Sequence, residues 1–79
     1  MKITYDRSVD AAYIYLTSGI GAGGVAKTYC CDPLEVHGQI HLDFDNQGRL
    51  VGIEVLGASR LLPEAATTLR ESGEPPIDP

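Results

Sequence analysis

An alternation of apolar and polar side chains between residues 39 and 56 constrains the fold of this chain more than any other feature. Apolar residues occupy alternate positions on both sides of a short gap: Ile40, Leu42, Phe44, Val51, Ile53 and Val55. A period of two is typical of strands with one buried face. The gap at residues 45–48 ends in Gly48, which tolerates the positive φ that tight turns require. The segment therefore predicts an antiparallel hairpin.

The same alternation predicts a register for this hairpin. We expect three cross-strand pairs, which leave residues 45–48 as the loop: Phe44 with Arg49, Leu42 with Val51, and Ile40 with Ile53. A slip by one residue would set Ile40 against Glu54 and place a carboxylate on the buried face.

Three further strands are expected before this hairpin. Residues 2–5 and 11–17 show the same period of two, and a glycine-rich turn separates the second from a third strand at 25–31. Pro33 ends that strand because it lacks the backbone donor of a sheet ladder. Residues 34–38 are expected to form a loop or a frayed strand.

The periodicity changes after Gly57. Ser59 can cap a short turn, and Pro63 suits the first position of a helix of about nine residues that Gly73 can end. So short a helix needs the sheet for stability. Its expected docking residues are Leu61, Leu62, Ala65, Ala66 and Leu69. The sequence predicts an α+β fold: a small antiparallel meander sheet of roughly four to five strands with a C-terminal helix packed on it.

Length and composition predict one domain. The 79 residues leave room for a single domain at 1–72, and residues 73–79 read as a flexible proline-rich tail. A domain of this size has a thin core, so self-association into a dimer is expected to add burial.

The charge distribution indicates which class of partner the chain can bind. The formal net charge is −5, and the basic residues are spread along the chain, whereas direct nucleic-acid binding needs concentrated positive charge. A basic protein partner is expected instead. Without a long apolar run or a secretory signal, we expect no membrane partner and a cytoplasmic location. Cys30 and Cys31 are adjacent and form no disulfide framework.

Two segments resemble motifs of a small prokaryotic family. Residues 5–16 carry Tyr-Asp, a short gap and Asp-Ala-x-Tyr-Ile-x-Leu. Residues 42–59 carry Leu-Asp-x-Asp, a turn, Gly-x-Leu-Val-Gly-Ile-Glu-x-Leu and Ala-Ser. On these motifs, over roughly residues 2–62, the chain resembles the YuzE-like family, domain of unknown function 2283.

The resemblance implies a meandering sheet followed by a helix and no established activity. Some members of that family lie beside toxin genes, which suggests an antitoxin-like role. The chain departs from the family in its 19–24 loop, its paired cysteines and its C-terminal extension, so the resemblance implies nothing for these regions. The candidate interaction or motif residues are Asp6, Asp10, Tyr13, Tyr15, Asp43, Glu54 and Ser59.

The glycine-rich segment 19–24 matches the spacing G-x-G-x-x-G. A dinucleotide site requires a helix N-terminus directly after these glycines, where the pyrophosphate binds. A strand is expected there, so a hairpin loop is the favoured interpretation and no cofactor is expected.

A metal site is the second alternative, with weak candidates at His37, His41, Asp43 and Asp45. Strand geometry extended back to residue 37 would place all four on one face, with Glu54 beside them, and these are ligands that suit zinc. Side chains on one face of a strand are about 6.6 Å apart, which makes convergence on one ion awkward. We therefore expect no metal and a solvated polar face.

Two sets of residues are candidates for catalysis. Paired carboxylates perform acid–base chemistry where a cleft raises one pKa. Asp6 and Asp10 are explained by capping of the first turn, and Glu54 fits an interface or structural role. A nucleophilic Cys30 or Cys31 would need thiolate activation by a histidine base, which no motif indicates. No catalytic residue is assigned.

Tyr13 and Tyr15 share one strand face, and tyrosines on such a face are typical of protein interfaces. Packing of both rings against the C-terminal helix is an equal alternative. The leading prediction is a non-catalytic, homodimeric protein-interaction module. The alternative is a metal- or small-ligand-binding protein, or a minor enzyme, that uses the polar face of His41, Asp43 and Glu54.

Overall fold

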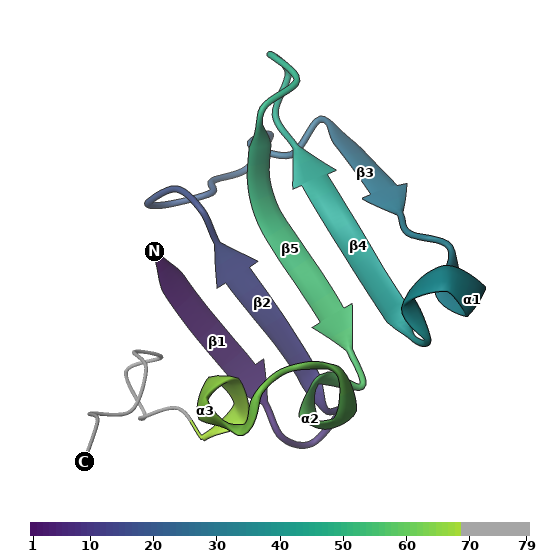
Figure 1. The fold of residues 1–79 in the computed structure, drawn as a ribbon. Helices are drawn as coiled ribbons and strands as arrows, with labels where there is room; N and C mark the ends of the chain where they lie inside the picture. Colours follow the sequence, from purple (N-terminus) through teal and green to yellow (C-terminus); the bar gives the residue numbers. More distant parts are fainter. Residues whose placement is uncertain (69–79) are drawn as a thin grey trace.

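The computed structural model describes residues 1–68. Within them lies one antiparallel sheet of five strands in the order β1-β2-β5-β4-β3, with three short helices (Figure 1). The strands are β1 Lys2–Asp6, β2 Ala11–Tyr15, β3 Lys27–Cys30, β4 Gln39–Phe44 and β5 Leu50–Leu56. The helices are α1 Pro33–Val36, α2 Ala58–Leu61 and α3 Glu64–Thr67. The predicted α+β class and antiparallel sheet are confirmed.

The strand order differs from that of a simple meander. A meander would place β3 beside β2, but β5 pairs with β2, and β3 pairs with β4 at the far edge. The most buried residues explain this order. Ala12 of β2 lies opposite Val55 of β5, both are 2% exposed, and Ala58 of α2 is fully buried against them. The core thus forms where β2 and the last strand, β5, meet.

The connection between β2 and β3 is consequently no hairpin loop, and that prediction for residues 19–24 is wrong. The segment passes the ends of β5 and β4 to reach the opposite edge of the sheet (Figure 1). Hydrogen bonds hold both of its ends, from the Leu16 N–H to the Val51 carbonyl (3.0 Å) and from the Ala26 N–H to the Phe44 carbonyl (2.8 Å). A strand, β3, follows the glycines rather than the helix that a dinucleotide site requires.

The β4–β5 hairpin is confirmed, but its predicted register is wrong by two residues. Leu42 lies opposite Ile53 and Ile40 opposite Val55, and a bulge then brings Phe44 opposite Leu50. Since side chains alternate with a period of two, this shift leaves every side chain on its predicted face. Two features produce the shift: the Asp45 N–H donates to the Arg49 carbonyl (2.9 Å) and closes a shorter loop, which moves the register by one residue, and the bulge between Asp43 and Phe44 adds the second. Gly48 completes that loop with φ of 78°.

A short helix, α1, occupies part of the segment that was expected to be a loop or frayed strand. Asp32 caps it, since one carboxylate oxygen accepts the N–H groups of Leu34 (2.8 Å) and Glu35 (3.4 Å). Pro33 occupies its first turn and His37 ends it in the left-handed conformation, with φ of 56°. An N-cap aspartate followed by proline is a known helix start, and its signal lay in the sequence.

The helix expected from Pro63 is present but shorter than predicted, and the turn expected before it is itself a short helix. α2 begins at Ala58 after Gly57, and Pro63 precedes α3, which ends at Thr67. Two of the predicted docking residues, Leu61 and Leu62, do pack against the core. Leu69 and the predicted tail at 73–79 lie outside the described residues.

The sheet has one apolar and one polar face. On the apolar face, α2 packs over Ala12 and Val55 at the end near the β1–β2 turn (Figure 1). The polar face is the side from which the alternate residues of β2, β5, β4 and β3 project: Tyr13, Tyr15, Gly52, Glu54, His41, Asp43, Thr28 and Cys30.

Candidate functional site

A hydrogen-bond network crosses the polar face and centres on Asp43. One oxygen of its carboxylate accepts the Tyr13 hydroxyl (2.6 Å) and the other accepts the Thr28 hydroxyl (2.6 Å). Tyr13 comes from β2 and Thr28 from β3, so Asp43 on β4 joins strands on both of its sides. Burial, followed by the bond to Asp43, raises the pKa of Tyr13 above its ordinary value, so the phenol stays a donor at neutral pH.

Gly52 makes this network possible. The Tyr13 side chain reaches over β5 to Asp43, and a Cβ at position 52 would overlap its hydroxyl and ring. Glycine inside a strand often marks such a close approach. That signal was present in the sequence, although the separation of 30 positions between Tyr13 and Asp43 concealed their contact.

His41 and Glu54 form a second pair on the polar face. They are direct cross-strand partners, and the His41 Nδ1 lies 3.1 Å from the Glu54 Oε1. Their side chains are 27% and 42% exposed, so solvent reaches both. Of the three predicted polar-face residues, His41 and Glu54 therefore contact each other, whereas Asp43 is held by Tyr13 and Thr28.

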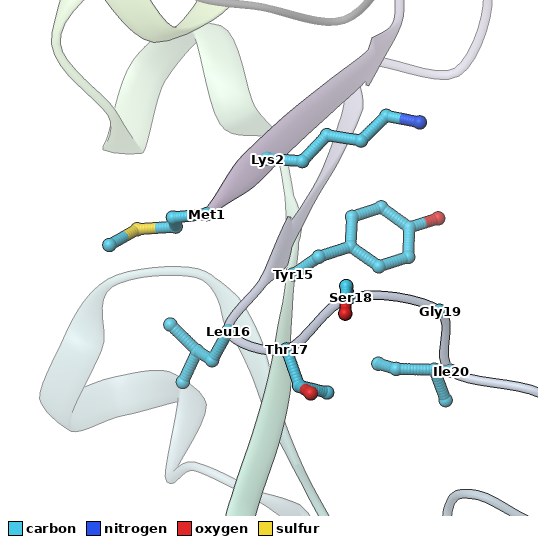
Figure 2. A pocket seen from close by; sticks show the side chains of 8 residues that line it. All are labelled: Met1, Lys2, Tyr15, Leu16, Thr17, Ser18, Gly19 and Ile20. Atoms are coloured by element: carbon cyan, nitrogen blue, oxygen red, sulfur yellow. The ribbon is translucent and has the colours of Figure 1, made fainter.

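The second predicted tyrosine, Tyr15, borders a hollow of about 430 Å³. Its ring centroid lies 4.7 Å from that of Tyr13, and the Lys2 ammonium lies 5.7 Å from the Tyr15 centroid. Figure 2 shows Lys2 and Tyr15 extending side by side above Ser18, while Met1 extends away on the other side of the strand. Both tyrosines are thus half-buried on the polar face and engaged in contacts within the chain.

Asp10 forms a separate cluster at the end of the sheet. Its carboxylate accepts the Tyr5 hydroxyl (2.6 Å), the Ser59 N–H (3.0 Å) and the Ser59 hydroxyl (2.8 Å). Its carbonyl accepts the N–H groups of Gly57 and Ala58 at 2.9 and 3.0 Å. The hydroxyl of Tyr5 and then the groups of Ser59 lower the pKa of Asp10.

Two turn predictions are decided by these contacts. Asp6 does cap the first turn, because it accepts the N–H (2.9 Å) and hydroxyl (2.6 Å) of Ser8. Asp10 does not cap that turn, because its carbonyl and carboxylate accept hydrogen bonds from residues at the start of α2. Ser59 was expected to cap a turn, but α2 has no side-chain cap of its own, and the Ser59 hydroxyl donates to Asp10. The two family motifs therefore meet at Asp10 and Ser59.

The four weak metal candidates are not brought together. His37 lies at the end of α1 rather than on a strand, and its carbonyl accepts from Arg60 (2.6 Å). The Asp45 carboxylate accepts from the backbone N–H groups of Gln47 and Arg49, and the Arg49 N–H bond lowers its pKa most. Within residues 1–68, no three histidine, cysteine or acidic side chains gather as a metal would require.

The cysteines are both free. Cys30 is exposed on β3 directly opposite His41, and Cys31 is half-buried. No hydrogen bond joins either thiol to a histidine in the described part of the chain. A row of thiol, imidazole and carboxylate thus crosses three strands, but only His41 and Glu54 are in contact.

The family model described as "Protein of unknown function (DUF2283)" matches residues 2–59. The chain belongs to this family. The DUF2283 match covers all five strands and reaches Ser59, so it includes both residues of the Asp10–Ser59 link. Neither the search of curated proteins nor that of solved structures found a match. Among residues 1–68, no helix has the length and apolar content needed to cross a membrane.

Proposed function

We propose that this chain is a non-catalytic protein-interaction module that self-associates and binds a basic protein. The observation that carries the proposal is the incomplete cover of the apolar face. α2 packs over β2 and β5, whereas a hollow of about 520 Å³ remains over β3 and β4. Its lining includes Tyr29, Leu42 and Phe44, and Tyr29 is 55% exposed.

The small core supports this proposal. Within residues 1–68, the buried hydrophobic residues are Ala12, Val51, Val55 and Ala58. Covering apolar surface contributes roughly 25 cal/mol per Å², so a partner over Tyr29 and Phe44 would add burial that this chain does not provide for itself.

Charge supports a basic partner. The net charge of −5 attracts positively charged proteins and speeds their association. An antitoxin-like role, in which the bound partner is a basic toxin, is one form that this function would take.

The test is a pull-down with the tagged chain, read by mass spectrometry for a basic protein at near one-to-one ratio. We expect Tyr29→Ala to lose this protein and Val9→Ala to retain it, because Val9 is also exposed but lies in the β1–β2 turn. Circular dichroism checks that both variants fold. Equal recovery by both variants, or no basic protein at all, would contradict the proposal. Tyr13→Ala is a poor probe, since Tyr13 supports the sheet.

The contact between His41 and Glu54 favours the alternative, a ligand-binding or catalytic polar face. Asp43 would contribute less to such a site, because both of its carboxylate oxygens already accept hydrogen bonds. Titration with zinc and with a metabolite set, followed by NMR, tests this alternative. It predicts shifts at His41 and Glu54 that Glu54→Gln abolishes; unchanged spectra would eliminate it for those ligands.

A further inference from the structure

One edge of the sheet is open along β3. This strand pairs with β4 on one side, and all four of its residues are exposed. Within residues 1–68, no strand pairs with its outer side. The opposite edge, β1, is in contact with α3. Open edges offer a row of backbone donors and acceptors to another strand.

The pairing with β4 determines which backbone groups face outward. The Cys31 N–H donates to the carbonyl of Ile40, its partner in the β3–β4 register. Because backbone groups of successive residues point to opposite edges, Tyr29 also bonds toward β4, whereas Thr28 and Cys30 direct theirs outward. An added strand must pair with Thr28 and Cys30.

We propose that a second copy of this chain pairs its β3 antiparallel with β3 of the first, around a two-fold axis at Tyr29. Outward groups then meet outward groups, with Thr28 of each copy opposite Cys30 of the other. The two sheets become one continuous sheet. This inference names the interface of the self-association in the proposed function and rests on that part of it.

The side chains of β3 favour a second copy. Around the axis, Tyr29 meets Tyr29 on the apolar face, in the close, non-hydrogen-bonded type of pair where aromatic contacts stabilise sheets. The two apolar hollows beside Tyr29 then join across the axis. Two copies that each carry a charge of −5 repel each other overall, but β3 contains no acidic residue and one lysine, Lys27.

Disulfide trapping tests the register. In a Cys30→Ser, Cys31→Ser background, Tyr29→Cys places two thiols at a Cα separation of about 4.5 Å, which a disulfide accepts. The matched control, Lys27→Cys in the same background, places them about 13 Å apart along the strands. We expect mild oxidation to give a covalent dimer at least about ten-fold faster for Tyr29→Cys. Equal rates, or faster trapping through Cys30 in Cys31→Ser alone, would overturn the proposal.

Sedimentation equilibrium tests the backbone pairing without cross-links. Cys30→Pro removes the outward N–H, whereas Cys30→Ala keeps it and removes only the thiol. A four-residue pairing is short, so we expect a dimer that dissociates in the micromolar range or above. Cys30→Pro should weaken it at least about ten-fold and Cys30→Ala less than about two-fold. A wild-type chain that stays monomeric up to about 1 mM would overturn the inference.

The two proposals fail separately. Recovery of a basic protein by the wild-type chain reports on partner binding, whereas the sedimentation of Cys30→Pro reports on the copy-to-copy interface. A monomeric wild-type chain that still captures the basic protein would overturn the β3 pairing and leave partner binding supported.

Discussion

At the scale of single residues, Asp10 and Gly52 are the positions on which the most structure depends. Asp10 adopts a left-handed conformation, with φ of 52°, and so directs both its carbonyl and its carboxylate at the start of α2. Gly52 leaves room for a tyrosine to cross a strand. Both act over long sequence separations, since Asp10 and Ser59 are 49 residues apart.

Asp10 gives the fold a predicted pH dependence. Its bonds to Tyr5 and Ser59 lower its pKa below the ordinary 3.8, so the stabilisation is present above that value and is lost as the pH falls through the folded pKa. We expect Asp10→Asn to have a lower melting temperature than wild type at pH 7, with the difference shrinking toward pH 2. Thermal melts of both proteins across this range measure it. A constant difference at every pH would contradict the assigned role.

Gly52→Ala is expected to destabilise the protein by about 2 kcal/mol, because the new Cβ displaces the Tyr13 ring from Asp43. Urea unfolding measures the loss. The matched control repeats the substitution in a Tyr13→Ala background, where the obstructing ring is gone. There the cost should fall below about 1 kcal/mol, and an undiminished cost would show that the overlap with Tyr13 is not its cause.

At the scale of elements, the β4–β5 hairpin was the most predictable part of the sequence. Its strands and faces follow from the apolar alternation alone. The register of the hairpin could not be predicted in this way, because a shift by two residues preserves every face. Only the Asp45–Arg49 closure and the bulge beside Phe44 distinguish the alternatives. The strand order could not be predicted either, since the alternation in β2 gives it an apolar face but does not specify which strand pairs with it. Asp32 and Pro33, by contrast, did signal α1.

The hairpin loop depends on the left-handed conformation of Gly48. Its φ is 78° and no atom lies near the position of a Cβ, so backbone strain alone opposes a side chain there. We expect Gly48→Ala to cost about 1 kcal/mol in urea unfolding and Gly48→Asn less, because asparagine tolerates this conformation. Equal costs for the two variants would contradict this explanation.

At the scale of the whole molecule, the candidate site was predictable in part. The alternation placed His41, Asp43 and Glu54 on one face, and the structure confirms that face. The alternation could not show that Asp43 is held by Tyr13 and Thr28, because those contacts depend on the strand order. The uncovered apolar hollow over β3 and β4 depends on where α2 docks, which local patterns do not specify.

Amide hydrogen exchange tests the central claim, that this chain acts through association at β3, most directly. Exchange is measured by NMR at about 10 μM and at about 1 mM protein. We expect the Thr28 and Cys30 amides to exchange quickly in the dilute sample and to become protected in the concentrated one, while Tyr29 stays protected in both. Unchanged exchange of Thr28 and Cys30 across this range would contradict the account.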